Sequence, residues 1–188
     1  MIDRDKFFAA VRDDPFGGNL TQGQVNGLNY LLDVWEVQFP TEDLRWLAYA
    51  LATAFHETAQ TMAPIEEYGQ GEGKPYGEPA GPYGQRYYGR GYVQLTWEDN
   101  YKKGEDILAD EYSISCPMHQ YPHRMLEHEP AALVLYDGMI DGWFTGLALP
   151  DFFNDAREDP FNARKIVNGL DKAEEIAGFY WAFKKSLM

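Results

Sequence analysis

Three glutamates are the residues of this chain whose types and spacing best suit acid–base chemistry. Glu57 closes an apolar segment, and Glu66 and Glu67 follow it shortly afterwards. A Gly-, Pro- and Tyr-rich loop then leads to a run of aromatic and hydrogen-bonding residues, Tyr87 to Thr96. Two carboxyl groups can hydrolyse a glycosidic bond as acid and base. The stretch from Ala54 to Tyr101 therefore predicts a glycosidase site, and the rest of the chain is expected to support it.

An apolar helix is expected to position Glu57. It would begin at Pro40–Thr41, and its apolar residues cover most of the circumference, which predicts a buried helix. Its main stripe consists of Leu44, Leu47, Leu51 and Phe55. Near the C-terminal end of this helix, Glu57 would be partly desolvated and would face the negative end of the helix dipole. Both effects disfavour the charged form, as a general acid requires; the alternative is an exposed helix-end glutamate without a role.

The segment from Gly69 to Gly91 shows neither a helical nor a strand period. It is expected to be an ordered functional loop, because tyrosines are uncommon in flexible linkers. The pattern Gly69–Gly73 does not predict a phosphate loop, since it contains Glu72 and no Lys-Ser/Thr pair follows. Tyrosines of the loop would stack on sugar rings or pack the loop itself: Tyr68, Tyr76, Tyr83, Tyr87 and Tyr88. Hydrogen bonds to sugar hydroxyl and N-acetyl groups would come from Gln94, Thr96 and Asn100.

Helix signals along the remaining chain predict a mainly α fold in one domain, residues 1–188. Asp3 and the capping box of Thr21 and Gln24 mark two helix starts. Further helices are expected to begin at Thr96, Glu129–Pro130 (through Trp143) and Asp171, with a short helical stretch over Asn162–Val167.

Charge and composition exclude several functional classes. The chain has 16 Lys and Arg against 30 Asp and Glu, a formal charge of −14, so nucleic acid is not expected as a partner. This charge also opposes approach to an anionic cell wall, although a local groove can differ. No apolar run reaches the ~20 residues of a bilayer span, and no signal peptide is visible. With Cys116 as the single cysteine, an internal disulfide is excluded.

Two motifs stand out: His56–Thr58 reads His-Glu-Thr, and Tyr88–Trp97 contains the run Tyr-Gly-Arg-Gly-x-x-Gln-Leu-Thr. Both resemble motifs of glycoside hydrolase family 19, the chitinase family of the lysozyme-like superfamily, which includes many bacteriophage endolysins. Ile166–Gly169 is similar to the late Asn-Gly segment, and Gly142–Gly146 resembles the endolysin-like branch. The resemblance covers the chain from Leu44 onward. It implies a lysozyme-like helical domain with a substrate groove. No metal or cofactor is expected.

The resemblance also implies roles for individual residues. Glu57 matches the general acid, and the general base is either Glu66, slightly favoured, or Glu67. Inversion of configuration would require the two carboxyl groups to stand roughly 6.5–9.5 Å apart. Arg90 matches an arginine that orients the surroundings of the acid more than it touches substrate. The remaining substrate- or water-binding positions would be Tyr88, Gln94, Thr96, Asn100 and Asn168. The chain departs from the family in having Ala59–Gln60 after His-Glu-Thr and in lacking the cysteines of plant chitinases.

The expected function is that of an endolysin-type muramidase. It would cut the β-1,4 bonds of peptidoglycan as a monomer, made in the cytoplasm of a bacterial host and acting at the wall after release, without membrane insertion. The first alternative is a chitinase acting on chitin oligomers. The second is a non-catalytic cell-wall-binding or phage structural protein, which would keep the aromatic groove and lose the acid.

Two other chemistries are disfavoured by the sequence. A metalloprotease would need a second histidine where Gln60 stands. His119 and His123 have metal-like spacing, but Pro117 and Pro122 would break a helix that aligned them. A cysteine peptidase would use Cys116 with one of these histidines, yet no helix N-terminus would activate the thiol.

Overall fold

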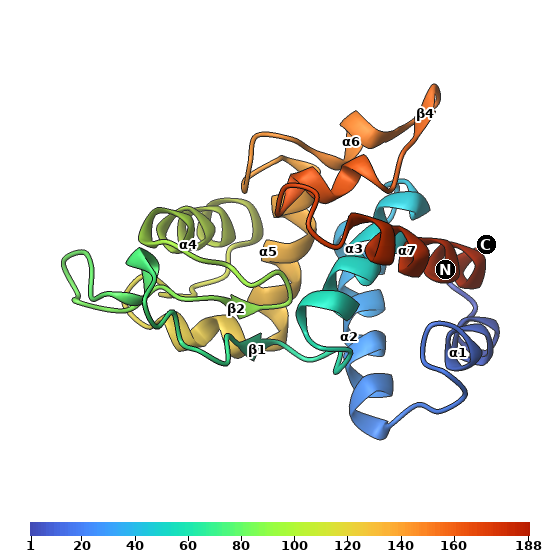
Figure 1. Ribbon diagram of the computed structural model, residues 1–188, viewed down its shortest axis with the longest axis horizontal. Helices are drawn as coiled ribbons and strands as arrows, with labels where there is room; N and C mark the ends of the chain where they lie inside the picture. The colour runs from blue at the N-terminus through green and yellow to red at the C-terminus, as the bar shows by residue number, and fades with distance from the viewer. The chain divides into compact units, whose positions relative to one another are not determined.

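The computed structural model describes residues 1–188, which fall into two units of dense internal contacts. Unit 1 comprises Met1–Met62 and Tyr136–Met188, and unit 2 comprises Ala63–Leu135. Figure 1 shows that unit 1 is mostly helical and that unit 2 combines helices with long loops; the helical content of the whole chain confirms the mainly α class. That the chain acts as one domain stays a prediction. None of the helices combines the length and apolar character required to cross a membrane.

Unit 1 is built around the helices α3 (Leu44–Glu57) and α7 (Ala173–Leu187), which lie side by side (Figure 1). Helix α1 (Arg4–Asp13) also contacts α7. The other elements of unit 1 are α2 (Gln22–Gln38), the second half of α5 (His128–Ile140), α6 (Leu149–Phe152), the hairpin β3–β4 (Phe153–Asn154 and Arg157–Glu158) and the 3-10 helix η3 (Asn162–Ile166).

The buried helix predicted before Glu57 is confirmed. Every residue of α3 from Leu47 to Phe55 is buried. The ring of Phe55 lies 4.9 Å from that of Phe16 and 4.7 Å from that of Phe179, so α3 is fixed to α7 by aromatic contacts. Helix α3 ends at Glu57, which places this carboxylate at the rim of the core.

The predicted start of α3 at Pro40–Thr41 is wrong. The helix begins at Leu44, because the side chain of Asp43 accepts a hydrogen bond of 2.8 Å from the backbone N–H of Arg45 and caps the first turn. The caps at Asp3 and Thr21 are confirmed, since each side chain accepts a hydrogen bond from the backbone N–H three residues later.

Three other predicted helix boundaries are wrong. Helix α4 begins after Trp97, not at Thr96, and α7 begins after Lys172, not at Asp171. In both places the residue before the helix has a positive φ, which stops the helix from extending backwards. Helix α5 ends at Ile140, before the predicted Trp143, ahead of the positive φ of Gly142.

Unit 2 holds a small antiparallel pair of strands, β1 (Ile65–Glu66) and β2 (Arg90–Gly91), in which Ile65 pairs with Gly91 and Glu66 pairs with Arg90. The other elements are η1 (Pro75–Gly77), α4 (Glu98–Tyr112), η2 (Pro122–Leu126) and the first half of α5. The sequence does not predict β1 and β2, because two residues are too few to show the alternation of a strand.

The Gly-, Pro- and Tyr-rich loop joins β1 to β2 and is held by backbone contacts. A Cβ atom on Gly77 would lie 1.9 Å from the carbonyl oxygen of Gly71, so two turns of the loop touch at a distance that only glycine permits. The N–H of Tyr87 donates to the carbonyl of Tyr76 at 3.1 Å. Tyr87 and Tyr88 are buried and Tyr68 is exposed, so the tyrosines divide between packing and surface roles.

Two glycines of α2 give opposite expectations for stability. A Cβ atom at Gly27 would lie 1.8 Å from the carbonyl oxygen of Met62, whereas at Gly23 it would meet only Thr21 Oγ1 at 3.9 Å. Gly27→Ala is expected to lower the free energy of unfolding by about 3 kcal/mol, and Gly23→Ala to raise it by about 0.5 kcal/mol. Urea unfolding of both variants checks this; equal effects would contradict the contact between α2 and Met62.

Candidate active site

Glu57 forms an ion pair with Arg164 within unit 1. The guanidinium Nη1 of Arg164 donates to Glu57 Oε1 at 2.7 Å, and the side chains are 2% and 15% exposed for Arg164 and Glu57. The Nε of Arg164 donates to the carbonyl of Asp171 at 2.9 Å, which fixes the guanidinium on its other side. Glu57 Oε2 accepts no hydrogen bond from the protein, so Arg164 orients the carboxyl group and leaves one oxygen for chemistry.

Arg164 is a residue that the sequence does not single out. Its guanidinium makes a charge-assisted hydrogen bond to the carboxyl group of Glu57. Beside this pair, His56 Nδ1 lies 3.8 Å from Glu175 Oε1. On the same face of α3, burial raises the pKa of Tyr49 well above its ordinary value. The C-terminal end of α3 therefore carries polar and charged side chains, whereas most of the helix before it is apolar.

Glu66 is held in unit 2 by a tyrosine. The hydroxyl of Tyr88 donates to Glu66 Oε2 at 2.9 Å, and Gln70 Nε2 donates to Oε1 at 3.4 Å. Burial, and next the hydrogen bond to Glu66, raise the pKa of Tyr88, so this hydroxyl remains a donor. Glu66 is partly exposed, and its carboxylate can therefore meet a water molecule.

Glu67 is held by a different set of donors. The backbone N–H of Gly89 donates to Glu67 Oε2 at 3.2 Å, and the Tyr76 hydroxyl donates to Oε1 at 3.4 Å. The pKa of Tyr76 is raised by burial and next by the charge of Glu67. Each of the two adjacent carboxylates thus has its own tyrosine, and the assignment of the base stays open between them.

Arg90 packs against the ring of Tyr88. Its guanidinium carbon lies 3.6 Å from the centre of the Tyr88 ring, a cation–π contact. Its Nη1 donates to the Tyr88 carbonyl at 3.2 Å and to the Tyr101 hydroxyl at 3.1 Å. Arg90 is only 6% exposed and is part of the packing that positions Tyr88. Because the Tyr88 hydroxyl donates to Glu66, Arg90 affects the position of Glu66 indirectly.

The other predicted binding residues divide between the two units. Gln94 Nε2 donates to the carbonyls of Ile65 and Gly91, which ties it to the strand pair. Asn100 Nδ2 donates to the Thr96 carbonyl at 2.9 Å, so both residues stand at the start of α4. Asn168 is exposed in unit 1, and its N–H donates to the carbonyl of Arg164. Unit 2 thus gathers Glu66, Glu67, Tyr88, Arg90, Gln94, Thr96 and Asn100, and unit 1 gathers Glu57 and Asn168.

The residues of the disfavoured chemistries have structural partners. His119 Nε2 lies 2.9 Å from Glu98 Oε1, and the Tyr87 hydroxyl donates to the His119 carbonyl. No group of three His, Cys, Asp or Glu side chains is arranged to hold a metal ion. Cys116 is buried, and burial raises the pKa of its thiol, which opposes formation of a reactive thiolate.

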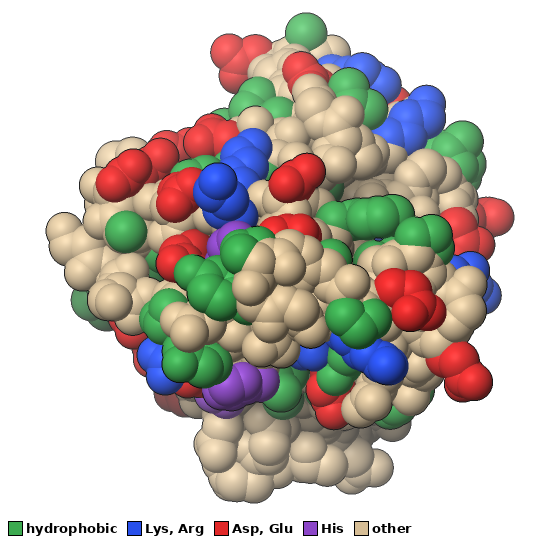
Figure 2. Space-filling view, turned by 90° about the vertical axis from the view of Figure 1, so that its left-hand side faces the viewer, with side chains coloured by type: hydrophobic (Ala, Val, Ile, Leu, Met, Phe, Trp, Pro, Cys, Tyr) green, Lys and Arg blue, Asp and Glu red, His purple; other side chains and the backbone are tan.

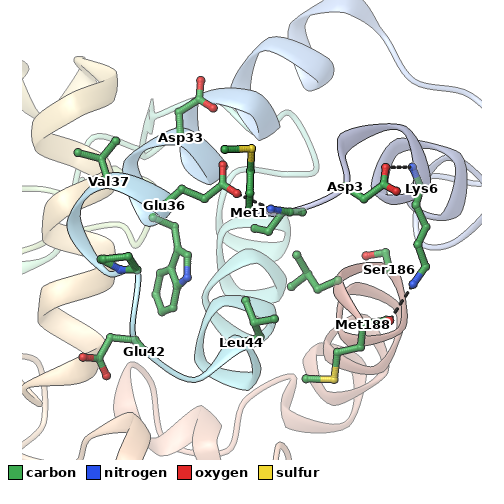
Figure 3. A pocket seen from close by; sticks show the side chains of 14 residues that line it. Met1, Asp3, Lys6, Asp33, Glu36, Val37, Glu42, Leu44, Ser186 and Met188 are labelled. Carbon is green, nitrogen blue, oxygen red and sulfur yellow. Dashed lines mark hydrogen bonds between the residues drawn. The ribbon is translucent and has the colours of Figure 1, made fainter.

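A cavity of about 880 Å³ in unit 1 lies away from the predicted site residues. Figure 3 shows this cavity near both chain termini, lined by Leu44 and Glu36 among others. Beside it, the Lys6 side chain donates a hydrogen bond to the Met188 carbonyl. Leu44 begins α3 and Glu57 ends it, about 20 Å further along at 1.5 Å per residue. This cavity is therefore separate from the Glu57 site.

The chain has a mainly helical fold in which a buried helix ends at Glu57 and a small strand pair carries Glu66. The chain shares this fold with chitinases of glycoside hydrolase family 19. Chitinase C from Streptomyces griseus HUT6037 matches with a TM-score of 0.54 at 21% identity, over 99% of this chain and 92% of that chain. The family 19, class IV chitinase from Zea mays matches at 0.51 and 20% identity, over 97% and 91%. No protein-family model and no curated protein matches the sequence.

Proposed function

We propose that this protein is a glycoside hydrolase that cleaves β-1,4 bonds between N-acetylated amino sugars with inversion. The observation that carries the proposal is the position and environment of the Glu57 carboxyl group. Its carboxyl group ends a buried helix, is oriented by a buried arginine and keeps one oxygen free. The fold shared with family 19 chitinases supports the same class of reaction.

The proposed reaction needs one proton donor and one proton acceptor. Glu57 gives its proton to the glycosidic oxygen as the bond from that oxygen to the anomeric carbon breaks. Glu66 or Glu67 takes a proton from a water molecule, whose oxygen bonds to the anomeric carbon from the opposite face. Glu57 ends as carboxylate and the base ends protonated, so one proton exchange with solvent restores both.

Glu66 and Glu67 can be distinguished by single substitutions. Replacing the base by glutamine is expected to lower kcat by about 10²–10⁴-fold, whereas the same change at the other glutamate should lower it less than about tenfold. Release of reducing ends from a soluble glycan measures both. Because the two variants remove neighbouring carboxylates of equal charge, each serves as the control for the other, and equal small losses would exclude both as the base.

For the polymer we propose peptidoglycan, cut between N-acetylmuramic acid and N-acetylglucosamine at the wall of a bacterial host after release from the cytoplasm. The likeness of Gly142–Gly146 and of Ile65–Glu66 to the endolysin-like branch supports this choice. The second candidate is chitin. The solved structures with this fold are chitinases, and a net charge of −14 suits an uncharged polymer better than an anionic wall.

Mass analysis of digests tests the choice of polymer. Purified peptidoglycan and a chitin oligomer are incubated separately with the protein, and the products are identified by mass and by their new reducing ends. Muropeptides with a reducing N-acetylmuramic acid end are expected. Products from chitin alone would assign the protein as a chitinase. Glycan binding without turnover at any pH would favour a non-catalytic wall-binding protein.

A further inference from the structure

The cavity of about 880 Å³ in unit 1 has a largely apolar lining. Four segments meet around it: the N-terminal residues up to the start of α1, the last turns of α2, the loop that leads into α3, and the end of α7. Its apolar lining includes Trp35, Val37, Pro40 and Leu44. Sites for small organic ligands have volumes of about 300–1,000 Å³ and mostly apolar walls. The cavity is therefore large enough to enclose such a ligand.

Four carboxyl groups also line this cavity: Asp3, Asp33, Glu36 and Glu42. Lys6 is the only basic side chain among the lining residues. Figure 3 shows that Lys6 is directed to the Met188 carbonyl, to which it donates at 2.7 Å, on the side away from Asp33 and Glu42. Apolar walls of low dielectric strengthen the field of charges that line a cleft. The cavity therefore favours a positively charged ligand.

The end of α2 that borders the cavity has a surplus of negative charge. Asp33 and Glu36 lie in the last two turns of α2, and its last turn contains no basic residue. The carbonyl groups at this end are the negative end of the helix dipole, which favours cations and disfavours carboxylates. Arg4 offsets part of this charge, because its Nη2 donates to Asp33 Oδ1 and to Glu36 Oε2 at 2.7 Å each. The Asp33 side chain remains 69% exposed, so a second cation can reach it.

Glu42 contributes a carboxylate that no cation of the chain neutralises. It lies in the loop between α2 and α3, is half-buried, and takes part in no ion pair within the protein. Acidic charge by itself does not mark a site, because Figure 2 shows acidic side chains spread over one face of the molecule. What distinguishes this cavity is that an unpaired carboxylate, a negative helix end and apolar walls surround one enclosed volume.

We propose that this cavity is a second ligand site, which binds an amphiphilic organic cation: an ammonium group joined to an aliphatic chain or ring. The apolar part of the ligand packs against Val37 and Leu44, and the ammonium group donates to the carboxylates of Asp33 and Glu42. Burial of the apolar part supplies most of the affinity, and the carboxylates select a cation over a neutral or anionic molecule. This inference does not rest on the proposed function, because no lining residue belongs to the candidate active site.

Titration of the full chain with n-hexylammonium, followed by ¹H–¹⁵N NMR, tests the proposal. The protein carries no added residues at either end, because Met1 and Met188 line the cavity. Saturable shifts are expected for the lining residues, including the indole N–H of Trp35. Methylammonium, which has the charge without the chain, should bind about tenfold more weakly or worse. Hexanol and hexanoate, which have the chain without the positive charge, should bind about fivefold more weakly or worse.

A matched pair of variants separates the cavity from the general acidic surface. Glu42→Gln is expected to raise the Kd for n-hexylammonium about fivefold, the effect of losing one partly screened ion pair, and to leave the Tm unchanged. Glu111→Gln changes the net charge by the same amount. Because Glu111 is exposed on α4 in unit 2 and does not line the cavity, this variant should leave the Kd unchanged.

The possible outcomes support or overturn the second site. Saturable binding that prefers n-hexylammonium and depends on Glu42 supports it. No saturable shift at the highest soluble concentration overturns it, and so does an equal loss of affinity in Glu42→Gln and Glu111→Gln, which would show unspecific attraction to acidic side chains. Equal binding of hexanol overturns the selection of a cation. Binding of a Leu-Lys-Leu peptide but not of n-hexylammonium would replace the small ligand by a peptide partner. Glycan hydrolysis is not measured, so these outcomes leave the proposed function to its own tests.

Discussion

Glu57→Gln is expected to lower the rate of glycan hydrolysis by about 10²–10⁴-fold, the range for loss of a general acid. Glutamine keeps the shape of glutamate and can accept the hydrogen bond from Arg164, but it has no proton to give to the leaving oxygen. Release of reducing ends from purified peptidoglycan and from chitin oligomers measures the loss. Activity should fall on whichever polymer the wild-type protein cleaves.

The glutamine variant also weakens a buried ion pair, so its stability must be known. We expect the free energy of unfolding to fall by about 1–3 kcal/mol, the value of a hydrogen bond to a charged group. Activity is therefore measured at a temperature where circular dichroism shows the variant to be folded. Glu175→Gln is the matched control: Glu175 lies beside the same helix end, 3.8 Å from His56, and should retain activity. Undiminished hydrolysis in Glu57→Gln would remove Glu57 from the mechanism.

Arg164→Met is expected to lower the free energy of unfolding by about 3 kcal/mol, because it leaves Glu57 unpaired at a largely buried position. The Arg164 side chain is 2% exposed, while the 15% exposure of Glu57 lets water reach the remaining carboxylate, which keeps the loss at the lower end for a buried pair. Activity should fall as well, because Arg164 orients the carboxyl group of Glu57. Urea unfolding and hydrolysis rates measure the two effects.

A double-mutant cycle isolates the pair from the packing of the arginine. Combining Arg164→Met with Glu57→Gln should destabilise by less than the sum of the single changes, with a coupling of about 1–3 kcal/mol. Arg157→Met is the control on the surface: its ion pair with Asp159 is 45% exposed at the arginine, and its loss should cost less than about 1 kcal/mol. Strict additivity at Glu57 and Arg164 would show that the pair contributes no interaction energy.

The position of Glu57 could be predicted from sequence because α3 is apolar on nearly every side, and such a pattern has few structural solutions. Its partner could not. Arg164 lies 107 residues away in the chain, and arginine is normally a surface residue. Nothing in the residues around Arg164 indicates that its guanidinium faces inward; only the packing of η3 against α6 and α7 places it there.

Local signals also failed where the backbone is set by tertiary contacts. The capping patterns at Thr96 and Asp171 are plausible, yet Trp97 and Lys172 take positive φ values and delay both helices. For Glu66 and Glu67 the difficulty is different. Neighbouring residues of an extended chain point to opposite faces, and each of the two carboxylates accepts a hydrogen bond from a different tyrosine. The structure therefore leaves the choice of general base between Glu66 and Glu67 as open as the sequence does.

Unit 1 is made of two chain segments separated by the whole of unit 2, and this arrangement dictates an order of events during synthesis. Helix α3 leaves the ribosome long before α7, the helix that covers Phe55. Until α7 emerges, the apolar face of α3 that α7 covers in the folded protein lacks this partner and is open to aggregation or to chaperones. Residues 63–135 are complete earlier and can fold first. Loss of α7 should therefore leave Glu57 without a folded support while unit 2 still forms, a difference that limited proteolysis of a shortened chain would reveal.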